Sequence, residues 1–84
     1  MTIGTKTKTR VLIVDDERLF AELLRVALRS ADGIEVIDVV HDVQTAVRRM
    51  TEARPEVVLA DYHLPDGTGS DIAGRSGRAI RSAS

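Results

Sequence analysis

The chain has 84 residues, the size of one small domain, and it carries a net charge of −1 with 30% charged residues. This charge balance argues against a nucleic-acid-binding or membrane-binding surface, and the absence of Cys excludes disulfides, thiolate metal sites and cysteine nucleophiles. No apolar stretch is long enough to span a membrane and the N-terminus has no signal-peptide core, so we expect a cytoplasmic domain.

The N-terminal part of the chain predicts a strand followed by a helix. Residues 1–9 form a polar, Thr-rich lead that we expect to be flexible. Residues 11–14 are all aliphatic, which is typical of a buried parallel strand. From Arg18 the apolar residues recur at helical spacing, and Gly33 is placed to end that helix. The apolar stripe of the helix consists of Phe20, Leu23, Leu24, Ala27 and Ala31.

The middle of the chain repeats this pattern and ends in a third strand. Residues 34–40 alternate in part, as a half-exposed edge strand does. Asp42 is expected to cap a second helix that Pro55 closes, and residues 57–60 form the third strand. The apolar face of the second helix carries Val43, Ala46, Val47 and Met50.

This order of elements predicts an α/β fold. Strands that begin evenly at Val11, Ile34 and Val57, with helices between them, predict a right-handed, doubly wound parallel sheet. Residues 70–84 contain several Gly, Ser and Arg residues and predict a weak third helix, starting near Ser70 or Asp71, or a disordered tail. Each interior Gly costs a helix ~1 kcal/mol relative to Ala. The tail arginines have no aromatic residues between them, so a solvated end is favoured over a nucleic-acid-binding helix.

Three aspartates follow two of the predicted strands. Asp15 and Asp16 come directly after residues 11–14, and Asp61 comes directly after residues 57–60. The carboxyl ends of the strands line the reactive edge of an open α/β sheet, so these carboxylates should lie together and repel one another unless a cation binds between them. Such oxygen ligands suit Mg²⁺, and a carboxylate beside that metal is suited to act as a nucleophile toward phosphorus.

Simpler roles exist for each of these acids. An acid after a strand often caps the next helix, and an Asp there often forms a turn. A cap needs only one acid, however, and the turn residues come later, at 64–67 (LPDG), so a metal site is the favoured interpretation. His41 and His63 have no acid partner at a suitable spacing, and neither side chain is expected to act as a metal ligand or general base.

The segments RVLIVDDE, IEVIDVV and DYHLPDGTG together resemble the receiver domain of bacterial two-component response regulators. DYHLPDGTG is similar to the family's D-x-x-[LM]-P-x-x-x-G signature. The resemblance covers residues 10–69 and is greatest with receivers joined to LuxR-type transcription regulators. It implies a partial flavodoxin-like sheet, of which this chain holds the first three βα units, and a phosphoacceptor module rather than an enzyme.

The resemblance also implies a role for each acid. Asp61 would accept a phosphoryl group from the phosphohistidine of a sensor histidine kinase in the presence of Mg²⁺. Asp16 would bind the metal directly and Asp15 mainly through water, with Asp61 completing the carboxylate set. The remaining protein ligand would be the backbone carbonyl of His63.

The family pattern contains further parts that this sequence lacks. In the family a fourth strand ends in a Ser or Thr and a fifth in a Lys, and both side chains contact the phosphoryl group, whereas this sequence has no Lys after Lys8. We therefore expect a truncated receiver whose third strand is an exposed edge, so that the chain is unstable or self-associates. The parent protein would regulate transcription, but this chain itself is not expected to bind DNA.

Two other functions stay open from the residues alone. One is a Mg²⁺-dependent phosphatase with an aspartyl nucleophile, although such enzymes commonly carry D-x-D rather than adjacent acids. The other is a fragment without function. A nucleotide-binding domain is disfavoured, because DDE rather than a Gly-rich loop follows the first strand.

Overall fold

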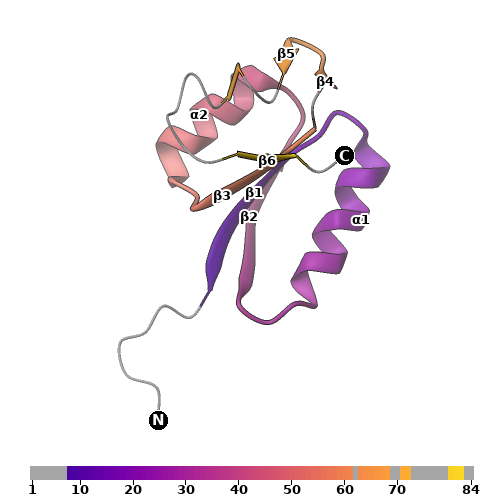
Figure 1. Ribbon diagram of the computed structural model, residues 1–84, viewed down its shortest axis with the longest axis vertical. Coiled ribbons are helices and arrows are strands. Elements are labelled where there is room, and N and C mark those ends of the chain that lie inside the picture. The colour runs from indigo at the N-terminus through magenta and orange to yellow at the C-terminus, as the bar shows by residue number, and fades with distance from the viewer. Residues whose placement is uncertain (1–7, 62, 69–70, 73–79, 83–84) are drawn as a thin grey trace.

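The computed structural model describes residues 8–61, 63–68, 71–72 and 80–82, and its centre is a parallel sheet with α1 and α2 on opposite faces (Figure 1). The elements in chain order are β1 (Thr9–Val14), α1 (Arg18–Arg29), β2 (Ile34–Val40), α2 (Val43–Ala53), β3 (Val57–Ala60), β4 (His63–Leu64), β5 (Gly67–Thr68) and β6 (Ile80–Ser82). The main sheet has the order β2-β1-β3-β6 with every pair parallel, and β4 and β5 form a separate antiparallel hairpin. The predicted α/β fold with a parallel sheet is confirmed.

Residues 11–14 of β1 are buried on both faces of the sheet, and their consecutive side chains point to opposite sides. Leu12 and Val14 belong to the core on the α2 side, and Val11 and Ile13 belong to the core on the α1 side. Burying a side chain of this kind fully stabilises the fold by about 1.5–3 kcal/mol. The core on the α2 side consists of Leu12, Val14, Val40, Val43, Ala46, Met50, Val58, Ala60, Leu64 and Ile72. It contains the face of α2 that the sequence predicts, with Val47 packed against it.

Helix α1 carries two neighbouring apolar stripes. The prediction of which stripe packs on the sheet is wrong. Ala21 is buried against the sheet and Leu24 and Leu28 pack beside it, whereas Leu23 is 59% exposed and Leu19 is 69% exposed. Of the predicted stripe, only Leu24 packs on the core. Apolar residues occupy most positions of this helix, so more than one stripe has helical spacing and the spacing alone does not select the buried one.

Helix α2 is held at both ends by side chains. The Asp42 carboxylate accepts a hydrogen bond from the backbone N–H of Thr45 at 2.7 Å, which confirms the predicted cap. At the other end Arg54 adopts the left-handed conformation, with φ of 51°. The Arg10 guanidinium donates to the carbonyl oxygens of Ala53 and Arg54, at 2.5 and 2.9 Å, so that a cation lies at the negative end of the helix.

Helix α1 begins after an acidic cap and ends before the predicted glycine. The Glu17 carboxylate accepts from the backbone N–H of Leu19 at 3.2 Å. The helix ends at Arg29, and Gly33, with φ of 81°, lies in the turn that leads into β2. Within the described ranges, no helix is long and apolar enough to cross a lipid bilayer.

The prediction that the third strand is an exposed edge of the sheet is wrong, because β6 pairs with it. Val58 lies opposite Ile80 and Ala60 lies opposite Ser82 in this parallel pairing. The pairing removes the basis for self-association through β3. Sequence patterns could not locate β6, since its three residues, Ile-Arg-Ser, form neither an aliphatic run nor a convincing alternation.

The segment that leads toward β6 starts as a helix. Asp71 and Ile72 are helical, as predicted. Thr68 and Asp71 form a reciprocal cap: the backbone N–H of Thr68 donates to Asp71 Oδ2 at 2.9 Å, and the backbone N–H of Asp71 donates to Thr68 Oγ1 at 3.4 Å. Residues 73–79 of the predicted third helix or disordered tail lie outside the described residues, as do residues 1–7 of the predicted flexible lead. For residues 80–82 that prediction is wrong, because they form the strand β6.

Candidate functional site

The backbone hydrogen bonds of the sheet continue past the ends of its strands into two of the three acids. The N–H of Asp15 donates to the carbonyl of Val40 at 3.0 Å, and the N–H of Asp61 donates to the carbonyl of Val14 at 2.9 Å. Since Val14 lies opposite Ala60, the register of β1 and β3 places Asp15 and Asp61 side by side at the carboxyl edge of the sheet. The position of these acids is therefore fixed by main-chain pairing.

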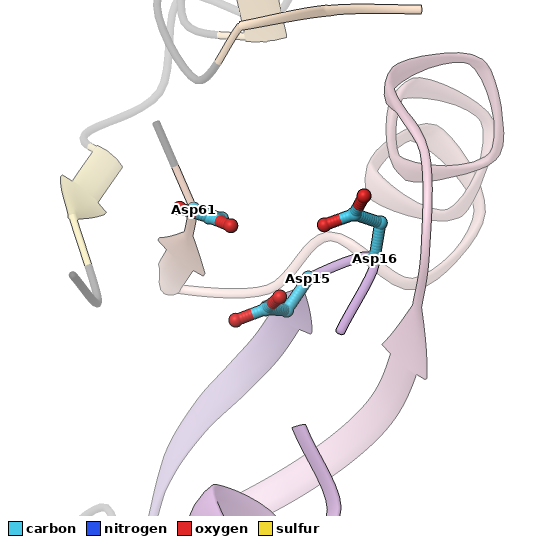
Figure 2. Close-up of side chains that lie close together, drawn as sticks. All are labelled: Asp15, Asp16 and Asp61. Atoms are coloured by element: carbon cyan, nitrogen blue, oxygen red, sulfur yellow. The ribbon is translucent and has the colours of Figure 1, made fainter. Parts of the chain in front are cut away.

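The three predicted aspartates converge at this edge (Figure 2). One carboxylate oxygen from each of Asp15, Asp16 and Asp61 lies within 4.8 Å of the others. Asp15 is only 1% exposed, Asp61 is half-buried and Asp16 is exposed. The cluster thus has one side chain embedded in the fold and one open to solvent, and an ion can reach it from the side of Asp16.

The electrostatics of the cluster disfavour three negative charges without a cation. Burial raises the pKa of Asp15, and the neighbouring carboxylates of Asp61, Asp16 and Glu17 raise it further. The backbone N–H of Glu17, which donates to Asp15 Oδ1 at 2.9 Å, lowers that pKa only in part. A cation bound among these oxygens would favour the ionised form of Asp15 by direct attraction.

The residues present fit Mg²⁺. Its preferred ligands are carboxylate and carbonyl oxygens together with water, and it is usually held by one or two protein carboxylates beside substrate phosphates. A cluster of three carboxylates with one exposed member offers such ligands and leaves room for water and a phosphoryl oxygen. Softer metals that select thiolates have no ligands here, because the chain contains no Cys.

The segment after Asp61 folds back as a hairpin over α2. His63 pairs with Thr68 and Leu64 pairs with Gly67. The side chain of Leu64 is buried in the core, and a Cβ at Gly67 would lie 2.6 Å from Asp71 Oδ2 and 3.0 Å from Val43 Cγ2. Only Gly fits this close approach without a shift of neighbouring atoms. The hairpin therefore lies directly on the first turn of α2.

His63 stands at the start of β4 with an exposed side chain. Its predicted contribution, a backbone carbonyl, stays a prediction.

Two residues near the site have contacts that the sequence did not suggest. His41 Nδ1 lies 2.7 Å from the backbone carbonyl oxygen of Asp15. The Asp66 carboxylate accepts hydrogen bonds from the backbone N–H groups of Val43 and Gln44. His41 follows β2 directly, so the rule that locates the three acids at strand ends would also have flagged it. Asp66 gave no signal beyond its place in a turn.

Comparison with known proteins adds independent information. The sequence model of the response regulator receiver domain matches residues 11–78. A protein-glutamate methylesterase/protein-glutamine glutaminase of Caldanaerobacter subterraneus subsp. tengcongensis is 38% identical over 60 residues, which cover 71% of this chain and 16% of that protein. The transcriptional regulatory protein BtsR of Salmonella typhi is 37% identical over 65 residues, covering 77% of this chain and 27% of BtsR. The chain thus spans a minor part of these relatives.

Solved structures show the same relationship. A LuxR-family two-component response regulator from Aurantimonas sp. SI85-9A1 superposes with a TM-score of 0.82 at 26% identity, over 90% of this chain and 58% of that one. The signal receiver domain of the putative response regulator NarL from Mycobacterium tuberculosis gives a TM-score of 0.79 at 26% identity, over 90% of this chain and 64% of that one. Both matches extend across nearly all of this chain.

Proposed function

Because this chain belongs to the response regulator receiver domain family, the phosphoacceptor modules of two-component systems, we propose that Asp61 is its phosphoacceptor. Receiver domains are phosphorylated by sensor histidine kinases. In the proposed transfer, an Asp61 carboxylate oxygen forms a bond to phosphorus while the P–N bond of the kinase phosphohistidine breaks. The electron pair of that bond returns to the imidazole nitrogen, which takes up a proton.

One observation carries this proposal: the half-buried Asp61 lies beside two further carboxylates at the carboxyl edge of the sheet. The metal that fits this cluster would be held by Asp15, Asp16, Asp61 and the backbone carbonyl of His63. When bound, Mg²⁺ neutralises charge on the phosphoryl oxygens. The protein's own part is to present Asp61 from a rigid strand end, where its backbone N–H is fixed by Val14.

The experiment is incubation of the chain with acetyl phosphate and Mg²⁺, followed by intact-mass spectrometry. The expected product is one phosphoryl group per chain, formed together with acetate and sensitive to hydroxylamine, as an acyl phosphate is. Asp61→Asn should abolish this labelling. Asp32→Asn, which changes an exposed acid in the turn before β2, is the matched control and should label normally.

Three results would count against the proposal. Labelling that persists in Asp61→Asn would place the phosphoryl group elsewhere. Steady release of phosphate over many turnovers would indicate a phosphatase with an aspartyl nucleophile. No labelling of a chain that circular dichroism shows to be folded would mean that the described site does not suffice for transfer.

For the protein as a whole we propose control of transcription as the output. The similarity to BtsR and to the LuxR-family regulator supports this, whereas the methylesterase relatives join the matched segment to an enzyme. The reading frame that encodes this chain distinguishes a transcriptional output from an enzymatic one. A helix-turn-helix domain encoded in the same reading frame supports transcription control, and an esterase domain there overturns it.

A further inference from the structure

The carboxylate of Asp66 is bound to the first turn of α2, which is remote from it in sequence. The backbone N–H of Val43 donates to Asp66 Oδ1 at 2.7 Å, and the backbone N–H of Gln44 donates to Asp66 Oδ2 at 3.0 Å. These are two of the N–H groups that an α-helix leaves without partners inside the helix. Both carboxylate oxygens are used, and the negative charge lies at the positive end of the helix.

The first turn of α2 is capped by two side chains, one local to the helix and one from the hairpin. Asp42 accepts from the backbone N–H of Thr45 at 2.7 Å and belongs to the helix start itself. Asp66, in contrast, belongs to the turn of the β4–β5 hairpin, in the segment that continues from Asp61. Its two hydrogen bonds therefore hold that segment against the helix.

The junction between β2 and α2 contacts both acid-bearing segments of the site. On one side His41 Nδ1 lies 2.7 Å from the backbone oxygen of Asp15. On the other side Val43 and Gln44 hold Asp66. Residues 41–44 thus connect the segment after β1 to the segment after β3, and these two segments supply the three carboxylates of the cluster.

We propose that Asp66 is a positioning residue, which fixes the hairpin that begins at His63 onto α2, so that the predicted backbone carbonyl ligand of His63 stays beside the acid cluster that the sheet holds. The part of this inference that concerns the metal rests on the proposed function. The closeness of Gly67 to Val43 supports it, because the hairpin has no room to approach α2 further and can only move away when the Asp66 hydrogen bonds are lost.

The test compares two caps of the same helix. Asp66→Ala removes both hydrogen bonds to the hairpin, and Asp66→Asn keeps one acceptor oxygen. Asp42→Ala is the matched control, since it removes a cap from α2 without touching the hairpin. Circular dichroism first establishes that each variant is folded. Mg²⁺ is then titrated while the backbone amide signals of the 84-residue chain are followed by NMR, and hydrogen exchange is measured on the same amides.

Asp66→Ala should weaken Mg²⁺ binding by about tenfold or more, the usual loss when a group that orients metal ligands is removed, and Asp66→Asn should weaken it less. Asp42→Ala should stay within about twofold of the parent, because the site is not tethered through Asp42. Equal weakening by Asp66→Ala and Asp42→Ala, or no weakening by Asp66→Ala, would overturn the proposal.

If the parent chain binds no Mg²⁺, the metal part of the proposed function fails and hydrogen exchange alone decides the inference. Faster exchange at the amides of Leu64, Gly67 and Thr68 in Asp66→Ala, with unchanged exchange there in Asp42→Ala, supports the positioning role. Unchanged exchange in Asp66→Ala refutes it.

Discussion

Replacing Asp15 by Asn should stabilise the metal-free chain. Asp15 is 1% exposed, and burial together with three neighbouring carboxylates raises its pKa. Asn has nearly the same shape, and its Oδ1 can still accept the hydrogen bond that the backbone N–H of Glu17 donates at 2.9 Å. The substitution therefore removes a buried charge and its repulsions while keeping the local contact.

The size of the effect follows from the spacing of the cluster. The three carboxylate oxygens lie within 4.8 Å of one another. Two unit charges at this distance repel by about 1 kcal/mol in bulk water and by about 3.5 kcal/mol at an effective dielectric constant of 20. Asp16 is exposed, so its repulsion with Asp15 should be close to the bulk-water value. Asp61 is half-buried, so its repulsion with Asp15 should lie between the two values. We expect Asp15→Asn to raise the free energy of unfolding by about 1–3 kcal/mol at neutral pH.

Urea unfolding followed by far-UV circular dichroism measures this change with and without Mg²⁺. At a Mg²⁺ concentration tenfold above its dissociation constant, the parent chain should gain about 1.4 kcal/mol, whereas Asp15→Asn should gain much less because a ligand charge is missing. Asp32→Asn, at an exposed acid outside the cluster, is the control and should change stability by no more than about 0.5 kcal/mol.

The pH dependence of the free energy of unfolding gives a further check that Asp15 destabilises the metal-free chain. Because the pKa of Asp15 is raised in the folded state, the folded chain holds this proton more tightly than the unfolded chain, and stability falls as pH rises through the window above the usual value of 3.8. The advantage of Asp15→Asn should therefore grow with pH and vanish in acid. A variant that is less stable than the parent without metal, or that gains as much from Mg²⁺, would refute the reasoning.

Two further predictions concern the ends of α2. Arg54 adopts the left-handed conformation at φ of 51°, so Arg54→Gly should stabilise the chain by about 0.5–1 kcal/mol, and a thermal midpoint at or below that of the parent would contradict this. The N–H of Thr45 lowers the pKa of Asp42, so the stability that Asp42 contributes is present above its usual pKa of 3.8 and is lost as pH falls through the lowered value. Asp42→Ala should cost about 1 kcal/mol at neutral pH, and urea unfolding should show this gap closing in acid; a gap independent of pH would contradict it.

The position of the acid cluster was predictable because it depends on short-range features. Asp15 and Asp61 follow aliphatic runs directly, and in a parallel sheet the ends of such runs lie at one edge. The observed pairing of Val14 with Ala60 gives this rule its physical basis. No knowledge of loops or of side-chain packing is needed to bring these two carboxylates together.

The contacts of Asp66 and His41 were not predictable, because each depends on segments far apart in the sequence. Asp66 in LPDG has every property of an ordinary turn residue, and its bonds to Val43 and Gln44 exist only once the hairpin and α2 have met. The exposed face of α1 illustrates the same limit. Helical spacing identifies an apolar face, but the neighbouring elements decide that Ala21 is buried and that Leu23 is not.

Main-chain pairing brings the acids together, and the repulsion between their charges lowers the stability of the sheet. Leu12, Ile13, Val14 and Val58 have no exposed surface, and burying each of them stabilises the fold by about 1.5–3 kcal/mol. The main-chain pairing that places Asp15 and Asp61 involves no cation, so the described sheet brings these carboxylates together before a cation binds. Metal binding to this site should therefore add stability without causing the chain to fold, in contrast to small domains whose metal assembles the structure.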